Sequence, residues 1–307
     1  MMRYAADLKS SKKPPRKFFN RNVVPYAGSR MDIIRSTRED IGRIATQLAN
    51  MGWAEANAGN ISVLLPEGSD EDIWRGDVIS DPLPSPIPEL AGRTFLITCA
   101  WSRFRRLSDS LEEEVIPARV SADGMRVIRL AGTREPTSEF STHILVLAES
   151  AGRGWKTASL VHTHSTHMLA LSSSDLPAEM LEDAVYRSHP EVSLLLRRGV
   201  RFLDYLTPGT WELGRETANA FRESDCVVWR KHGILGLGED IDSACDAVEV
   251  VEKAARLLLL EKSAFGKFVG LKDRDLMLDN GSDDSEQLEE PGLDLPPGPP
   301  VIDEETE

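Results

Sequence analysis

The sequence has few cysteines and no long apolar segment. Its three cysteines, Cys99, Cys226 and Cys245, lie far apart and form no CxxC pair. This spacing argues against a disulfide framework and against a cysteine zinc site, and it favours a reducing compartment. No apolar run approaches the roughly 18 residues that cross a membrane, and no apolar segment follows the basic N-terminus as in a secretory signal. We therefore expect a cytoplasmic protein without a membrane partner.

Charge is distributed unevenly along the 307 residues, whose net charge is −14. Residues 273–307 hold thirteen acids and one base, whereas residues 1–21 hold seven bases and one acid. The remaining body is mildly acidic, so nucleic acid is not an expected partner. We predict a basic, disordered arm over 1–30, a folded domain over 31–270 and an acidic, proline-rich, disordered tail over 271–307. A nucleic-acid or membrane arm and a docking tail are the less favoured alternatives.

The order of apolar segments predicts a mixed α/β fold. Amphipathic spacing and helix-start signals predict helices, whereas short apolar runs between turn residues predict strands. The expected helices span 33–51, 137–150, 178–188, 208–223 and 241–263. The expected strands span 61–65, 94–98, 115–120, 125–130, 160–164, 192–196, 199–203 and 226–229, the last continuing through 234–237. Residues 66–92 read as a proline-rich loop. Such interspersed strands and helices predict a mixed sheet covered by helices.

Three of the six histidines fall within six residues. Residues two apart on a strand point to the same face, so His162 and His164 are candidates for two ligands of one metal ion. A single strand histidine is more often a buried core residue, and the pair is what favours ligation. His167 lies out of phase with both, and we do not count it as a ligand.

A zinc site needs a third protein ligand, and a catalytic site keeps the fourth position open. His232 is the candidate, because it follows an apolar strand and precedes Gly233, which permits close backbone approach. His143 and His189 are the alternatives. His143 follows Glu139 by four residues in a predicted helix and could equally lie on the helix surface.

Two polar segments could hold an anion. Thr137 or Ser138 could cap the helix that follows Pro136, and a helix start is an anion site. Glu139, in the predicted first turn, is either a favourable charge at the helix dipole or a general base beside the metal. The turn at residues 57–60 reads Asn-Ala-Gly-Asn, which suits phosphate but also simply makes a turn.

Taken in order, four motifs resemble the class II aldolase/adducin family. They are Asn57-Ala58-Gly59-Asn60, Pro136-Thr137-Ser138-Glu139, His162-Thr163-His164 and Lys231-His232-Gly233. The resemblance covers about residues 33–268, and within the family it is strongest to the rhamnulose-1-phosphate aldolases. It implies a three-layer αβα fold with a largely antiparallel mixed sheet. It also implies a homotetramer with active sites at the subunit interfaces.

The resemblance further implies a role for each matching residue. His162, His164 and His232 match a zinc triad, with one Zn²⁺ per subunit, although another divalent transition metal would suit three imidazoles. Glu139 matches the catalytic glutamate. Asn57, Asn60, Thr137 and Ser138 match phosphate-contacting positions. Glu191 matches a second glutamate, contributed by the neighbouring subunit as an acid/base.

The implied reaction is the zinc-dependent cleavage of a ketose 1-phosphate to dihydroxyacetone phosphate and an aldehyde, L-lactaldehyde for rhamnulose 1-phosphate. One segment departs from the family pattern. Residues 99–106 read Cys-Ala-Trp-Ser-Arg-Phe-Arg-Arg where the family has a loop rich in glycine and serine. Arg103 or Arg105 could compensate by binding the anion, or the substrate could differ.

Three other functions stay open from the sequence. A sugar-phosphate dehydratase or a 4-epimerase of the same family would use the same three histidines. An adducin-like binding module would keep the fold without catalysis, although the intact triad argues against it. The third is a protein whose metal ion is purely structural and whose tails carry the function.

Overall fold

The computed structural model describes residues 30–69, 79–273, 275 and 276. The predicted arm over 1–30 and tail over 271–307 therefore lie almost wholly outside the described residues. The first residues after 270 lie against the folded body. The Leu271 N–H donates to the Arg187 carbonyl, and the Arg187 guanidinium pairs with Asp273 at 2.6 Å.

The described residues form a nine-stranded sheet with the order β2-β5-β4-β3-β1-β6-β9-β8-β7. Every neighbouring pair is antiparallel except β7 and β8, which are parallel because α7 crosses over between them. This confirms the largely antiparallel mixed sheet. The strands are β1 (Asn60–Leu64), β2 (Ile79–Pro82), β3 (Thr94–Thr98), β4 (Val115–Val120), β5 (Arg126–Arg129), β6 (Ala158–Thr163), β7 (Val200–Leu203), β8 (Cys226–Trp229) and β9 (Gly233–Gly238).

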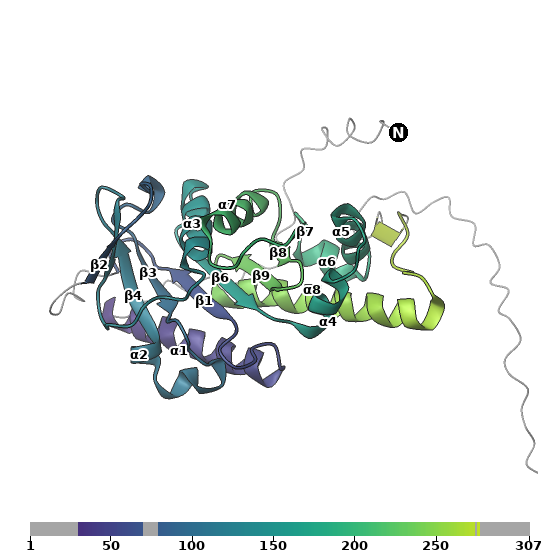
Figure 1. Ribbon diagram of the computed structural model, residues 1–307, viewed down its shortest axis with the longest axis horizontal. Helices are drawn as coiled ribbons and strands as arrows, with labels where there is room; N and C mark the ends of the chain where they lie inside the picture. Colours follow the sequence, from purple (N-terminus) through teal and green to yellow (C-terminus); the bar gives the residue numbers. More distant parts are fainter. Residues whose placement is uncertain (1–29, 70–78, 274, 277–307) are drawn as a thin grey trace, which may run out of the picture.

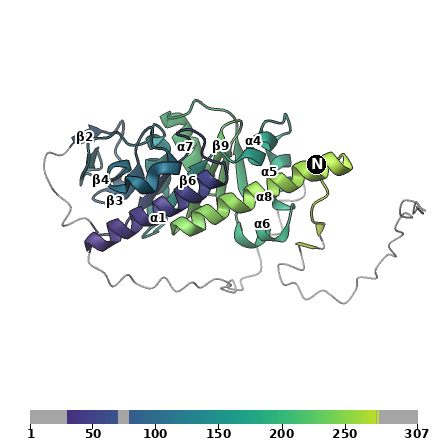
Figure 2. The ribbon, with the colours of Figure 1, turned by 90° about the horizontal axis from the view of Figure 1, so that it is seen from below.

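Helices cover both faces of the sheet, which gives three layers (Figures 1 and 2). One face carries α1 (Arg30–Asn50), α4 (Thr166–Ser172), α5 (Ala178–Tyr186), α6 (Pro190–Leu195) and α8 (Ile241–Phe265). The other carries α3 (Phe140–Gly152) and α7 (Trp211–Ala220). Successive side chains of a strand point to opposite faces of the sheet, so each strand contributes to a hydrophobic core on both faces. Val161 packs with the first group of helices, and its neighbour Leu160 packs with the second. None of the helices among the described residues is long and apolar enough to cross a membrane.

The segment predicted as a strand over 192–196 is instead the helix α6. Pro190 occupies its first turn, where a missing N–H costs nothing. Val192 and Leu196 are buried while Leu194 and Leu195 are exposed. That spacing of four residues between the buried positions fits a helix, which short apolar runs do not distinguish from a strand.

Residues 226–237 form a hairpin, not the single continuing strand that was predicted. β8 pairs antiparallel with β9, with Trp229 opposite Gly233. Lys231 adopts a left-handed backbone conformation, with φ of 63°, and so reverses the chain. The reversal places His232 at the tip of this turn.

Further elements were missing from the prediction. The loop predicted over 66–92 contains β2, an edge strand where Pro82 is tolerated because no partner needs its N–H. It also contains a 3₁₀ turn, η1 (Pro88–Leu90). Residues 104–114 form η2 (Phe104–Asp109) and α2 (Leu111–Glu114), and α4 follows β6 directly. These pieces are too short to show a clear period in the sequence.

Candidate metal centre and active site

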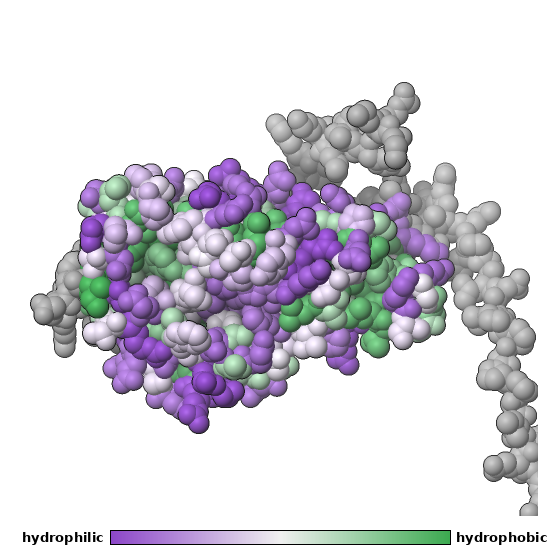
Figure 3. Space-filling view, in the orientation of Figure 1, coloured by the Kyte–Doolittle hydropathy of each residue, from purple (hydrophilic) through white to green (hydrophobic). Residues whose placement is uncertain are grey.

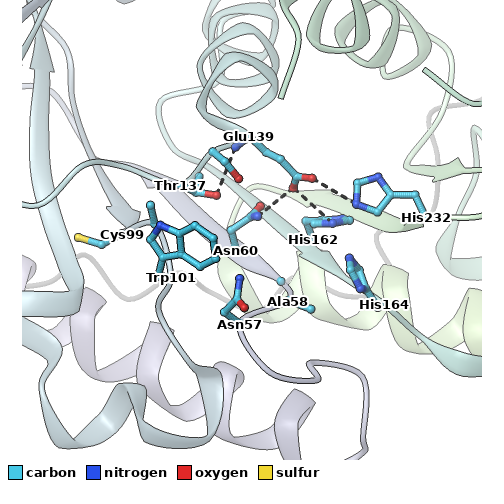
Figure 4. A pocket seen from close by; sticks show the side chains of 13 residues that line it. Asn57, Ala58, Asn60, Cys99, Trp101, Thr137, Glu139, His162, His164 and His232 are labelled. Carbon is cyan, nitrogen blue, oxygen red and sulfur yellow. Dashed lines mark hydrogen bonds and ion pairs between the residues drawn. The ribbon is translucent and has the colours of Figure 1, made fainter. Parts of the chain in front are cut away.

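Three histidines converge at one end of the central strand β6. His162 is the second-last residue of β6, His164 follows the strand, and His232 lies in the β8–β9 turn. β9 pairs with β6, so this turn lies beside the end of β6. One ring nitrogen of each histidine lies within 4.8 Å of the others, and the three rings pack edge to face at centroid distances of 5.1–5.2 Å (Figure 4). This is the arrangement of three ligands around one ion.

Hydrogen bonding fixes the tautomer of His162. Its Nδ1 lies 3.1 Å from the Ile234 carbonyl oxygen, which only accepts, so Nδ1 carries the proton. The lone pair is therefore on Nε2. That nitrogen is buried and has no hydrogen-bond partner among the described residues. A buried, unpaired lone pair aimed at two other imidazoles is what a metal ion would satisfy.

The other two rings complete the donor set. His164 Nδ1 lies 2.9 Å from a carboxylate oxygen of Glu55, which orients the ring. Burial lowers the pKa of His162 well below its ordinary value and lowers the pKa of His232 to about 4. Neutral imidazoles bind metal without first losing a proton. The site therefore fits a divalent transition metal, whereas His143 and His189 lie outside the cluster.

The backbone of the turn is packed against this cluster. A Cβ atom at Gly233 would lie 2.7 Å from His162 Cε1, 2.7 Å from the Thr163 carbonyl oxygen and 3.0 Å from His164 Cδ2. Glycine at this position is what allows the hairpin to approach β6 closely enough to bring His232 beside the other two histidines.

A buried carboxylate faces the cluster. Glu139 stands at the start of α3, with one carboxylate oxygen 3.4 Å from His162 Nε2 and the other 3.3 Å from His232 Nε2. The Asn60 side-chain amide donates to the first of these oxygens at 2.9 Å. The helix begins at Phe140, later than predicted. Thr137 Oγ1 accepts from the Glu139 N–H at 3.4 Å, and so holds the residue ahead of the helix.

A cavity of about 200 Å³ opens over these groups. Besides the three histidines and Glu139, its lining is formed by Asn57, Ala58, Gly59, Asn60, Cys99, Ala100, Trp101, Thr137 and Ser138 (Figure 4). All four residues predicted to contact phosphate thus lie around one pocket. Asn57 and Ser138 are exposed in it, whereas Asn60 and Thr137 are buried.

The unusual loop after β3 forms one side of the pocket. Trp101 has a left-handed backbone, with φ of 65°, and its side chain is 79% exposed. Hydrogen bonds hold the loop on both sides of Trp101: the Ala100 N–H donates to the Glu135 carbonyl, and the Ser102 N–H donates to the Cys99 carbonyl. A large aromatic residue is thus fixed at the pocket mouth.

The structure of one chain does not bring Glu191 to the pocket. Glu191 lies on α6 with its side chain 54% exposed, and its nearest described charge partner is His189 Nε2 at 3.8 Å. Its predicted role from a neighbouring subunit stays a prediction. Glu55, in contrast, lies beside the cluster but was missing from the sequence reasoning, because no spacing rule links a loop carboxylate to a histidine 109 residues away.

Residues 39–259 match the class II aldolase and adducin N-terminal domain. The chain belongs to this family. It is 29% identical over 244 residues to the rhamnulose-1-phosphate aldolase of Enterococcus faecalis, which covers 78% of this chain and 88% of the relative. It is 31% identical over 242 residues to the Yersinia pestis enzyme of the same name, with 73% and 85% covered.

Solved structures agree with this class II aldolase assignment. A sugar-phosphate aldolase from Thermotoga maritima superposes with a TM-score of 0.66 at 32% identity, covering 76% of this chain and 97% of that one. The family and these similarities make the chain a lyase of the class II aldolase family, as the order of the four motifs predicted. They also confirm the predicted fold class.

Proposed function

We propose that this class II aldolase cleaves a ketose 1-phosphate, with rhamnulose 1-phosphate as the first candidate, to dihydroxyacetone phosphate and an aldehyde, L-lactaldehyde. One observation carries the proposal. Three histidines converge on a point, and the Glu139 carboxylate lies within 3.4 Å of two of them, inside a pocket. The relatives named rhamnulose-1-phosphate aldolase support the choice of sugar.

His162, His164 and His232 would hold one Zn²⁺, or another divalent transition metal. When bound, the ion supplies Lewis-acid chemistry that polarises the ketose carbonyl. Glu139 moves the proton at carbon. When the carbon–carbon bond breaks, the electron pair stays on the phosphate-bearing fragment, and Glu139, carrying a proton taken up from solvent, protonates the carbon that keeps it. In the condensation direction Glu139 removes the same proton.

The phosphate end would bind on the side of the pocket away from the histidines. Asn57 and Ser138 are exposed there, and the positive end of the α3 dipole begins beside Ser138. Among the described residues, none that lines the cavity is a lysine or arginine. Amide, hydroxyl and N–H donors would therefore carry the recognition, with Trp101 bounding the space that remains.

The second proton, on the hydroxyl that becomes the aldehyde oxygen, needs another group. Glu191 fulfils this role in our proposal, but it is exposed on α6 and does not line the pocket of its own chain. It would act only in the pocket of another copy, which is why the proposal includes a homotetramer with shared active sites. Three free, buried cysteines are consistent with a cytoplasmic enzyme.

The test is metal content and cleavage in the wild type beside His164→Ala. We expect about one zinc per wild-type chain and release of dihydroxyacetone phosphate from rhamnulose 1-phosphate. His164→Ala loses one of three ligands, so metal and cleavage should fall together. His167→Ala is the matched control, because His167 is bonded to Glu252 outside the cluster.

Other results would point elsewhere. Zinc without cleavage would keep the metal centre and move the search to other sugar phosphates, including dehydratase and epimerase substrates, with Trp101 as the first residue to change. No zinc in either protein, even after incubation with the metal, would refute the proposal and favour a binding module.

A further inference from the structure

A buried chain of hydrogen bonds leads from the core to Glu139. His143, on α3, lies between Ser62 and Asn60 of β1: its Nδ1 is 2.7 Å from Ser62 Oγ and its Nε2 is 2.5 Å from Asn60 Oδ1. Asn60 in turn donates its side-chain amide to Glu139. His143 and Ser62 are at most 1% exposed and do not line the pocket, so neither touches a substrate.

The direction of each bond in this chain is determined. Asn60 Nδ2 must donate to the Glu139 carboxylate, so the other end of the amide, Oδ1, faces His143 and can only accept. His143 Nε2 therefore carries a proton. Burial lowers the pKa of His143 to about 4, so the ring is neutral near pH 7 and Nδ1 is an acceptor. Ser62 consequently donates its hydroxyl proton to Nδ1.

We propose that His143 is a positioning residue that fixes the orientation of the Asn60 amide and, through it, the Glu139 carboxylate at the metal centre. This inference rests on the proposed function of Glu139 as the group that moves the carbon-bound proton. A rotated Asn60 amide would turn its oxygen toward Glu139, where two acceptors would face each other. The imidazole prevents this, because its Nε2–H can donate only to the oxygen end of the amide.

The same observation gives Asn60 a role besides the predicted contact with phosphate. Its oxygen is used by His143 and one of its two N–H groups by Glu139. Of its two N–H donors, only the second is left for a ligand. Any contact of Asn60 with substrate is thus coupled to the position of Glu139.

The test compares two amide substitutions of His143. A glutamine amide nitrogen takes about the place of imidazole Nε2, so His143→Gln keeps a donor for Asn60. An asparagine amide reaches only the place of Nδ1, so His143→Asn leaves Asn60 Oδ1 unpaired. The readouts are zinc content, steady-state cleavage and exchange of the carbon-bound proton of dihydroxyacetone phosphate with D₂O, which reports the Glu139 step alone.

We expect His143→Asn to bind zinc normally and to lose about 10- to 100-fold in both kcat and proton exchange, with KM changed by less than about 3-fold. His143→Gln should recover most of this loss. Equal kcat in the two variants and the wild type would overturn the inference. So would equal losses in the two variants, because they would show that a donor at the place of Nε2 makes no difference to the reaction.

A second measurement separates this inference from the proposed function. Proteins labelled with ¹⁵N in histidine and asparagine should show wild-type His143 as the neutral Nε2–H tautomer, and a side-chain amide of Asn60 that exchanges slowly with solvent. That protection should persist in His143→Gln and disappear in His143→Asn. If the Asn60 signals are the same in all three proteins, the inference is wrong even if cleavage is observed. If they change but the wild type neither cleaves nor exchanges, the proposed function fails and the positioning of Asn60 stands.

Discussion

At the scale of single residues, one glycine decides whether three histidines can meet. Gly233 lies where a Cβ atom would touch His162 and the Thr163 carbonyl at 2.7 Å, a distance that real Cβ contacts do not show. The carbonyl and the ring both belong to residues of the rigid central strand β6, so neither can move away without a large cost in free energy.

We therefore expect Gly233→Ala to destabilise the protein by about 1–3 kcal/mol, as overpacking of a core does. It should also reduce zinc content, because the β8–β9 turn must move away from β6 and carry His232 with it. Thermal unfolding and metal analysis of the purified variant measure both effects. Gly154→Ala is the control for zinc content: its left-handed backbone, which Gly233 does not share, strains the alanine, but no atom lies within 4 Å of the added Cβ. Full zinc occupancy in Gly233→Ala would contradict this account.

At the scale of elements, α8 supplies the cap that α4 lacks. Ser165, at the start of α4, makes no side-chain capping bond. Instead the buried carboxylate of Glu252, on α8, accepts the N–H groups of His167 and Met168 at 2.9 and 2.8 Å and also the His167 ring at 2.7 Å. These are N–H groups that a short helix leaves unpaired at its start. The contact joins two helices and fixes the chain that leaves the metal centre.

We expect Glu252→Ala to cost about 1–3 kcal/mol, because one buried and one partly buried N–H group lose their acceptor. Zinc affinity should fall as well, since His164 directly precedes the start of α4. Denaturant unfolding of the metal-free protein and a zinc titration measure the two effects. Arg256→Ala, an exposed change on the same helix, should alter stability by less than about 0.5 kcal/mol. A Glu252→Ala protein as stable as Arg256→Ala would rule out the capping role.

At the scale of the whole molecule, buried neutral histidines make the metal-free fold sensitive to acid. Burial lowers the pKa of His143 and of His232 to about 4, and it lowers the pKa of His162 well below the ordinary value of 6.5. Between about pH 6.5 and 4 the unfolded chain therefore binds more protons than the folded chain. The contribution of these histidines to the free energy of unfolding is therefore fully present above about pH 6.5, and it is lost as the pH falls toward 4.

The fully buried His143 alone accounts for roughly 3 kcal/mol over that interval, from the shift of its pKa from 6.5 to about 4. Urea unfolding of the metal-free protein between pH 7.5 and 5 measures the slope. The slope should be shallower in His143→Gln, which has no imidazole to protonate. An unchanged slope in that variant would mean that His143 does not titrate as its burial requires.

Much of this architecture could be predicted from local patterns. The long helices α1 and α8 follow from apolar periodicity, and α7 begins at Thr210, whose hydroxyl accepts the Leu213 N–H. The motifs at 57–60, 136–139, 162–164 and 231–233 all surround the cavity, as their resemblance to the family implied. The predictions for α6 and for the β8–β9 hairpin were wrong, because these short elements depend on contacts that an apolar run of four or five residues does not encode.

By itself, the sequence determined the fold class, the family and the three histidines as the candidate metal ligands, because residue type, local period and motif order are carried by the chain. Only the tertiary structure decided which partners orient these groups. The Ile234 carbonyl fixes the tautomer of His162, Glu55 orients His164, and His143 holds Asn60 against Glu139. Each of these contacts joins residues that are more than seventy positions apart. Hydrogen bonds of this kind depend on distance and direction in space, which are set only when the sheet has brought its strands together.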